Sequence, residues 1–344
     1  MNKIEEKFLE ATKNILEKNL GINKSEYVDN TVIFVYDLES KLSIELSKWY
    51  IANLQDRKNT LLIDYNKVDN LELKEQLLWL KEWSTVVLVQ STNFRLDNFR
   101  IRLNLHNRWI WCLEHTHLIY IKDDQIENYA DAIEYRMPFY DELSLKLKKL
   151  SDNADNMRFI CNDGSELFIE WWFEDMKQNT GNYEWKRRWW TFPIWENFTE
   201  AVDFDKVNGE LCVYAYPGSD LQVNFEKPFK IQINNSKVTC NDKDMPEWFW
   251  KVLEMISKWE NNEVVLRELW FGLNYGISRE NVLSDINAYE RIAGFHLSLW
   301  KKHQIYRKKY KKTEIQRYHI DIFPDIKEFY IGETKVFENE KYII

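Results

Sequence analysis

The sequence predicts a mixed α/β protein that begins with a doubly wound α/β domain. Between residues 31 and 150, runs of β-branched and aromatic residues alternate with segments of helical spacing. Such alternation is typical of βαβ units, in which helices cover both faces of a parallel sheet. From residue 156 the pattern changes to short strands joined by turns. We therefore expect an α/β domain over 1–155 and an α+β domain over 156–344.

The expected strands of the first domain are continuous apolar runs, which suit the buried strands of a parallel sheet. They lie at 31–36, 60–65, 85–90 and 109–113. Helices are expected around them, at 2–20, 39–54, 71–82, 95–107 and 126–150. Neither a Gly-x-Gly-x-x-Gly motif nor a P-loop follows a strand, so no nucleotide site is expected in this domain.

Short strands and two helices are expected in the second domain. Asn162-Asp163-Gly164 joins two apolar runs and is typical of a hairpin turn with a positive φ at Gly164. Further strands are expected at 210–215, 229–234, 264–271 and 292–300, and the helices at 246–260 and 279–289.

The composition indicates a soluble globular protein without nucleic-acid or membrane partners. The chain has 344 residues, of which 44% are hydrophobic and 30% charged. It has no run of the roughly 18 apolar residues that a membrane helix needs. No apolar signal region follows Met1, so a cytoplasmic location is expected. The net charge of −9 disfavours a nucleic-acid partner, because neutralised phosphates supply most of that affinity.

Three other groups of residues are expected to have structural roles. The four cysteines lie in scattered apolar runs without CxxC spacing and are expected to be buried free thiols. His115 and His117 have the spacing of a metal pair on a strand, but no carboxylate lies in register nearby, which favours a structural role. The basic residues between Lys301 and Lys312 are expected to form a solvated helix or loop.

Candidate metal-binding side chains lie in three short apolar segments of the last third of the chain. They are Glu268, His296 and the pair His319 and Asp321. His319 and Asp321 are two residues apart, so on a strand both point to the same face. An imidazole and a carboxylate on one face can share a cation, and Glu268 and His296 would complete its ligand shell.

The order of these segments resembles that of the aminopeptidase T-like metallopeptidase family. The matching segments are Pro193-Ile-Trp-Glu196, Glu268-Leu-Trp-Phe-Gly-Leu-Asn274, Gly294-Phe-His296 and His319-Ile-Asp321. Asn162-Asp-Gly-Ser-Glu-Leu167, Val207-Asn-Gly209 and Ile331-Gly-Glu-Thr-Lys-Val336 also match, so the resemblance covers about residues 158–338. It implies that the second domain is an aminopeptidase T-like metal-binding catalytic domain.

The resemblance also implies a site for two divalent ions, which would be Zn, Co or Mn. Its ligands would be Glu196, Glu268, His296, His319 and Asp321, with Glu196 bridging the two ions. In the family a metal-activated hydroxide attacks a peptide carbonyl. This implies release of an N-terminal residue from a small peptide, or hydrolysis of a related amide. A homodimer is expected by analogy with the family.

Departures from the family pattern identify further candidate site residues. Trp195 replaces the glycine that usually precedes the first Glu. His303 replaces a family tyrosine, for which Tyr306 is a nearby substitute, so His303 and Tyr306 are assigned to catalysis. Trp190 and Trp195 are expected to line the substrate pocket, because indole rings make rigid walls. Arg95, which follows a strand of the first domain, is a candidate to bind a substrate carboxylate.

Two alternatives to the hydrolase remain open. The first is the branch of the same fold that resembles 2,5-dihydroxypyridine dioxygenase. That type of enzyme uses one Fe(II) held by two His and one carboxylate. Such a triad leaves positions open for a chelating substrate and O₂. His296, His319 and Asp321 would form that triad here, although the branch has a His where this chain has Glu268. The other alternative is a non-catalytic metal-binding descendant of the fold, which the replacements at Trp195 and His303 would favour.

Overall fold

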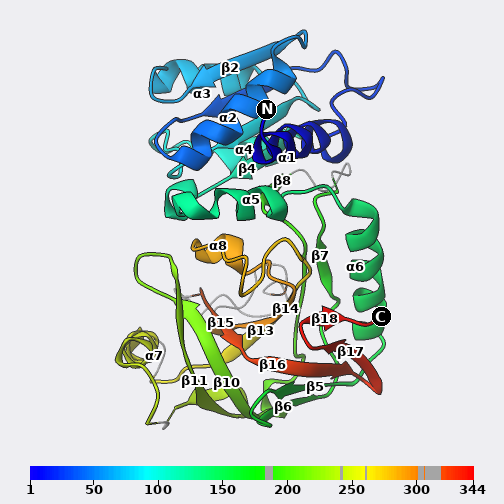
Figure 1. Cartoon of the computed structure of the whole chain (residues 1–344), viewed down its shortest axis with the longest axis vertical. Coiled ribbons are helices and arrows are strands. Elements are labelled where there is room, and N and C mark those ends of the chain that lie inside the picture. The colour runs from blue at the N-terminus through cyan, green and yellow to red at the C-terminus, as the bar shows by residue number, and fades with distance from the viewer. Residues whose placement is uncertain (183–188, 241–242, 260–261, 301–305, 307–318) are drawn as a thin grey trace. The chain divides into compact units, whose positions relative to one another are not determined.

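The computed structural model describes residues 1–182, 189–240, 243–259, 262–300, 306 and 319–344. In it the chain is a mixed α/β protein with one parallel and one largely antiparallel sheet (Figure 1). The chain divides into two compact units. Unit 1 consists of Met1–Met137, Asn179–Ile194 and Gly276–Ala288, and unit 2 of Pro138–Gln178, Trp195–Tyr275 and Tyr289–Ile344.

These units differ from the continuous ranges 1–155 and 156–344 expected from the sequence. Strand β8 (Trp189–Phe192) pairs with β4 (Trp111–His115), so a late segment of the chain returns to the parallel sheet. Ser284 likewise donates its backbone N–H to Gln125 Oε1 within unit 1, over 2.8 Å. Pairings between residues so far apart leave no local signal in the sequence.

The parallel sheet of unit 1 has the strand order β2-β1-β3-β4-β8. Strands β1 (Val32–Tyr36), β2 (Thr60–Asp64) and β3 (Thr85–Val89) confirm the expected apolar runs. β4 begins two residues later than expected, because Trp109 has a left-handed φ of 59°. β8 has no counterpart among the expected strands.

Helices cover both faces of this sheet. On one face, Tyr50 of α2 (Lys41–Leu54) meets Phe34 of β1, with 5.3 Å between the ring centroids. On the other face, α3 (Asn70–Trp79) and α4 (Ile101–Asn107) share an apolar cluster with Ile33. Ile33 and Phe34 are neighbours in a strand and therefore point to opposite faces. This is the arrangement that the alternating strands and helices predict.

The remaining elements of unit 1 are short helices. α1 (Lys3–Asn14) begins at a capping box between Asn2 and Glu5 and continues as a π-helix at Ile15–Asn19. 3₁₀ turns at Leu118–Tyr120 and Asp123–Gln125 lead into α5 (Ile126–Ala132). The helix expected from residue 95 begins only at α4, because Asp97 has a positive φ of 47°.

Unit 2 is built on the second sheet, whose main path is β18-β17-β16-β5-β6-β10-β15-β14-β13-β9-β7. The first half of its strands are β5 (Asn156–Cys161), β6 (Glu166–Glu170), β7 (Lys177–Asn179), β9 (Glu196–Glu200), β10 (Val207–Pro217), β11 (Val223–Asn234) and β12 (Lys237–Thr239). The others are β13 (Leu266–Gly272), β14 (Gly294–Trp300), β15 (His319–Pro324), β16 (Ile326–Ile331), β17 (Thr334–Glu338) and β18 (Lys341–Tyr342).

Three helices and a 3₁₀ turn at Phe204–Lys206 complete the described chain. α6 (Met137–Ser151) and α7 (Glu247–Trp259) agree with the expected helices. The helix expected at 279–289 is wrong, because only α8 (Ile286–Tyr289) forms. The Ser278 hydroxyl accepts the backbone N–H groups of Glu280 and Asn281, and such local hydrogen bonds compete with a helix.

The cysteines and the helix lengths can also be compared with the sequence predictions. All four cysteines are buried thiols that form no disulfide, as predicted. Within the described part of the chain, no helix combines the length and the apolar character needed to cross a membrane.

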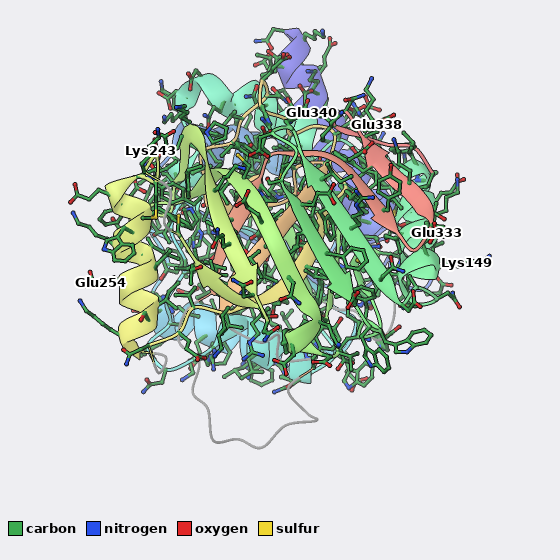
Figure 2. All side chains as sticks on the ribbon, turned by 90° about the horizontal axis from the view of Figure 1, so that it is seen from below. Lys149, Lys243, Glu254, Glu333, Glu338 and Glu340 are labelled. Carbon is green, nitrogen blue, oxygen red and sulfur yellow. The ribbon has the colours of Figure 1, made fainter. Side chains whose placement is uncertain are left out.

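Most charged side chains of unit 2 lie in water. Figure 2 shows Lys149 of α6, Glu254 of α7 and Glu333 of the β16–β17 turn projecting outward from their elements. Such exposed charges need no partner in the protein. Carboxylates buried among apolar residues do need one, because removing a charge from water is unfavourable unless it is paired or bound to a metal. The buried carboxylates of this sheet, such as Glu196, Glu268 and Asp321, therefore need a cation as partner.

Gly272, at the end of β13, allows a close approach of two backbone segments. A Cβ atom there would lie 2.0 Å from the carbonyl oxygen of Ile292 and 2.8 Å from that of Arg291. We expect Gly272→Ala to lower the free energy of unfolding by about 1–3 kcal/mol, because backbone must move to admit the methyl group. Urea denaturation measures the change.

Gly218→Ala is the matched control. A Cβ atom at Gly218 would first meet the side-chain tips of Asp220 and Asn224, which can rotate away. We expect it to change stability by less than about 0.5 kcal/mol. Equal effects of the two substitutions would contradict the close approach at Gly272.

Candidate metal centre

The candidate site lies on one face of four adjacent strands of unit 2. The strand register places Asp321 of β15 opposite Ser298 of β14, Ser298 opposite Glu268 of β13, and Glu268 opposite Glu200 of β9. Directly opposed residues of an antiparallel sheet point to the same face. Their side chains therefore form a polar row, which we call the acidic row.

A row of rings runs beside the acidic row on the same face. Phe198, Trp270, His296 and Phe323 lie on β9, β13, β14 and β15. The ring centroids are 4.3 Å apart for Phe198 and Trp270, 5.8 Å for Trp270 and His296, and 5.3 Å for His296 and Phe323. The imidazole of His296 therefore has an aromatic ring against each of its faces. We call these four residues the aromatic row.

His296 is buried, and its two ring nitrogens form no hydrogen bond with the described residues. Its exposed fraction is 1%, and among the described residues neither ring nitrogen has a hydrogen-bond partner. Burial lowers the pKa of His296 to about 3, despite the opposing charge of Asp321. The imidazole is therefore neutral at physiological pH, which is the form that binds metal ions.

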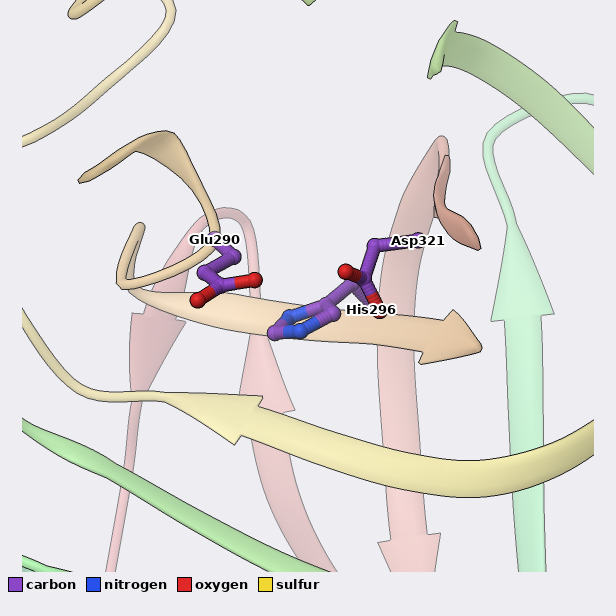
Figure 3. Close-up of side chains that lie close together, drawn as sticks. All are labelled: Glu290, His296 and Asp321. Carbon is purple, nitrogen blue, oxygen red and sulfur yellow. The ribbon is translucent and has the colours of Figure 1, made fainter. Parts of the chain in front are cut away.

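Two carboxylates lie close to this imidazole. One donor atom from each of Glu290, His296 and Asp321 can be chosen so that all three atoms are within 4.8 Å of one another. Figure 3 shows the three side chains lying together, with Glu290 on the turn that precedes β14 and Asp321 on β15. Glu290 was missed in the sequence, because it lies in a connection and belongs to no family motif.

His319 lies between two carboxylates of the acidic row. Its Nδ1 is 3.5 Å from Glu268 Oε2, and its Nε2 is 3.3 Å from Asp321 Oδ1. Burial opposes the imidazolium, but Asp321 and Glu268 outweigh burial and raise the pKa of His319 to about 10. Burial would raise the pKa of Asp321, but the charge of His319 lowers it to about 2. Without a metal ion, His319 is the cation that both carboxylates share.

Glu268 is held by hydrogen bonds as well as by this charge. Its Oε2 accepts hydrogen bonds from Trp270 Nε1 and Ser298 Oγ, each over 3.0 Å. Burial raises the pKa of Glu268 to about 7, an effect that the charge of His319 opposes. The two rows are thus linked, because Trp270 belongs to the aromatic row and donates to the acidic one.

Glu196 has a different partner from the one predicted. Its Oε2 is 2.6 Å from Nη1 of Arg291, which also pairs with Glu290. Burial would lower the pKa of Arg291, but Glu196 and Glu290 raise it, so the guanidinium stays charged. Arg291 thus supplies the positive charge that the resemblance assigned to two bridged metal ions at Glu196. The sequence offered no signal for this pair, whose members are 95 residues apart.

Trp195, which stands where the resemblance places a glycine, has a backbone conformation that favours glycine. Its φ of 88° lies in the left-handed region, which costs about 1–2 kcal/mol for a residue with a side chain. Its indole is 2% exposed and packs against Tyr140, with 4.7 Å between ring centroids. The side chain that departs from the family pattern is thus part of the core of unit 2.

Of the other predicted site residues, Tyr306 lies beside the aromatic row, Arg95 and Trp190 belong to unit 1, and His303 lies outside the described residues. Tyr306 packs against Phe198 and Trp270, and its hydroxyl donates to the carbonyl oxygen of Asp175 over 2.9 Å. Arg95 and Trp190 belong to unit 1, where Arg95 is exposed and Trp190 pairs with Leu113. His303 and the basic residues between Lys301 and Lys312, apart from Tyr306, lie outside the described part of the chain.

The two histidines of unit 1 have structural partners, as expected. His115 Nε2 and Nδ1 are each 2.8 Å from a tyrosine hydroxyl, of Tyr50 and Tyr129. His117 Nε2 and Nδ1 are 2.9 and 2.8 Å from the side-chain amides of Asn93 and Asn287. Their nitrogens are therefore occupied, in contrast to those of His296.

Comparisons with known proteins bear on this site. No family model matches the sequence, and no curated protein matches it. Among solved structures, the chain is similar to 2,5-dihydroxypyridine dioxygenase from Pseudomonas putida KT2440, with a TM-score of 0.62. The match has 13% sequence identity and covers 96% of this chain and 97% of that one. At this identity it shows a shared fold. It agrees with the dioxygenase alternative and gives no support to the aminopeptidase prediction.

The buried pair of Arg291 and Glu196 gives a stability prediction. We expect Arg291→Met to lower the free energy of unfolding by about 3–5 kcal/mol, because it leaves buried carboxylates without their cation. Arg158→Met is the control, because Arg158 pairs with Glu166 at the surface, and a loss within about 1 kcal/mol is expected. Urea denaturation of both variants measures the difference, and equal losses would contradict the role of Arg291.

The position of His319 gives a pH prediction for the metal-free protein. Its folded pKa of about 10 lies above the ordinary value, so its contribution to stability is complete below about pH 6.5 and is lost as the pH rises to 10. In chelator, we expect His319→Gln to lose less stability than the wild type between pH 7 and 10. Denaturation curves at several pH values test this, and parallel losses in the two proteins would refute it.

Proposed function

We propose that unit 2 is a metal-dependent oxygenase centre, in which one divalent ion supports O₂-dependent opening of a hydroxylated aromatic ring. The observation that carries this proposal is His296, a neutral imidazole that is buried with both nitrogens unpartnered beside the carboxylate of Asp321. The reaction class comes from the similarity in fold to 2,5-dihydroxypyridine dioxygenase.

The residues present fit a metal ion. A buried polar atom without a hydrogen bond costs about 1–3 kcal/mol, and coordination through one ring nitrogen would relieve part of that penalty at His296. His296 and Asp321 supply the imidazole and carboxylate donors that non-haem iron sites use. When bound, such an ion supplies coordination of O₂ and of a chelating substrate.

The residues of this chain would provide the surroundings of that ion. The aromatic row gives an apolar surface against which a flat ring can pack. His319 has one nitrogen toward Glu268 and the other toward Asp321, and 35% of its side chain is exposed. A proton from the solvent side can therefore be held at either nitrogen of His319, next to the site.

A dinuclear aminopeptidase-like hydrolase is the second candidate. One observation favours it, because Glu196, Glu268, His296, His319 and Asp321 all lie on the same face of adjacent strands. Against it, the carboxylate of Glu196 is paired with Arg291 and belongs to no compact set of metal donors among the described residues. A single ion is therefore the better supported arrangement. The homodimer and the cytoplasmic location remain predictions from the sequence.

Metal analysis distinguishes the candidates, using protein purified without a metal-affinity tag. One iron per chain, with O₂ uptake on adding 2,5-dihydroxypyridine or a related hydroxylated ring, is the expected result. Two Zn, Co or Mn ions and release of an N-terminal residue from a peptide would support the hydrolase. Absence of any bound metal, with melting unchanged by chelator, would oppose both.

His296→Ala tests the residue on which the proposal depends. We expect metal affinity to fall by more than about 100-fold, because loss of a ligand exceeds the 10–100-fold effect of residues that only orient ligands. His106→Ala is the control, because His106 is an exposed histidine of α4 in unit 1. Retention of metal by His296→Ala would exclude this residue as a ligand.

A further inference from the structure

We propose that Glu290 is the third protein ligand of this site, so that the ion is held by one imidazole and two carboxylates. This inference rests on the proposed function, because it concerns the same ion. It departs from the ligand sets that the resemblance implies, none of which includes Glu290. It also changes the chemical class of the site, from two histidines and one carboxylate to a set dominated by oxygen.

The positions of the donor atoms support this set. An ion about 2.1 Å from each of its ligands separates any two of them by at most about 4.2 Å. Donor atoms of Glu290, His296 and Asp321 already lie within 4.8 Å of one another. Small movements of side chains would therefore bring all three to a common ion. The close-up shows the carboxylate of Glu290 directed toward the imidazole of His296 (Figure 3).

His296 shows that this is more than a cluster of acidic residues. Its ring is 1% exposed, and neither nitrogen has a hydrogen-bond partner among the described residues. Metal-binding histidines usually donate their second N–H to a carboxylate or carbonyl, which fixes the ring. Here Trp270 and Phe323 lie against the two faces of the ring and fix it by stacking. One nitrogen is then free to meet the ion.

The fold holds Glu290 at this place. Glu290 occupies the turn between α8 and β14, and the next residue, Arg291, pairs with Glu196 on β9. Gly272 lets the backbone at Arg291 and Ile292 approach β13 closely. The turn is thus attached to two strands of the sheet, and the carboxylate of Glu290 is positioned by residues that are themselves buried or close-packed.

His319 is less suited to be the third ligand. Its two nitrogens face two different carboxylates, Glu268 through Nδ1 and Asp321 through Nε2. A ligand presents one nitrogen to the ion, and no nitrogen of His319 forms a compact set with His296 and Asp321 among the described residues. His319 instead links Asp321 to Glu268, as a residue that orients a ligand.

The charge and the donor atoms both indicate the kind of ion. Arg291 and His319 supply two positive charges, which four carboxylates share: Glu196 and Glu290 at Arg291, and Glu268 and Asp321 at His319. A divalent cation would balance the excess. Carboxylate-rich sites suit hard ions such as Mn²⁺, whereas imidazole favours Zn²⁺ and Ni²⁺. We therefore infer that the site binds Mn²⁺ or Fe²⁺ more tightly, relative to Zn²⁺, than the Irving–Williams order of affinities predicts.

Binding of Mn²⁺ to the metal-free full-length protein tests the inference, by calorimetry and by the electron paramagnetic resonance signal of free Mn²⁺. We expect Glu290→Gln to weaken Mn²⁺ binding more than about 100-fold, as loss of a ligand does, and His319→Gln to weaken it about 10–100-fold, as loss of an orienting residue does. The exposed control Glu333→Gln should leave Mn²⁺ binding unchanged. Glu290→His should shift the preference from Mn²⁺ toward Zn²⁺, because it replaces oxygen by nitrogen. Circular dichroism of each variant checks that it is folded.

The outcomes separate this inference from the proposed function. If Glu290→Gln and Glu290→His bind Mn²⁺ and Zn²⁺ as the wild type does, while His319→Gln loses binding, Glu290 is not a ligand but the metal centre stands. If the folded wild type binds neither Mn²⁺ nor Fe²⁺, the proposed function fails, and the inference fails with it. If Glu290→Gln does not fold, the metal preference of Glu290→His decides, and an unchanged preference overturns the inference.

Discussion

The structure of unit 2 depends on the balance of charge on one buried face of its sheet. Glu196, Glu200, Glu268 and Asp321 lie on that face with exposed fractions of 5% or less. Each would be strongly unfavourable alone in an apolar interior. Arg291 and His319 each pair with two carboxylates, which ties the turn before β14 and the start of β15 to the neighbouring strands. The positions of the candidate ligands follow from these attachments.

The antiparallel register of the strands determines which side chains lie next to one another on this face. Side chains along a strand point alternately to the two faces of the sheet, so every second residue of each strand lies on the same face. Here the repeat brings acidic side chains into one row and rings into the next, across β9, β13, β14 and β15. A polar surface for a cation and an apolar surface for a flat molecule thus adjoin. The similarity in fold to a dioxygenase is consistent with such a surface but does not by itself assign a reaction.

The sequence predicted what has a local signal. Apolar runs identified β1, β2 and β3, and the spacing of His319 and Asp321 correctly placed both on one face of a strand. The sequence did not predict the residues of short connecting turns or the pairs between residues far apart in the chain. Glu290 lies in a turn after a helix of four residues, and Arg291 meets Glu196 only through folding. Trp195 was read as a pocket wall because nothing local shows that its indole packs on Tyr140.

Unit 1 is built from three separate stretches of the chain, and this affects how it folds during synthesis on the ribosome. Its sheet receives β8 from residues 189–192, and its last segment ends at residue 288. A nascent chain adds residues from the N-terminus, at roughly 5–20 per second. The first 137 residues therefore leave the ribosome with the β4 edge of the sheet still open, and that edge is covered only after residues 189–192 have been made. Exposed strand edges of this kind invite association with other chains, so the growing polypeptide is a natural client for chaperones.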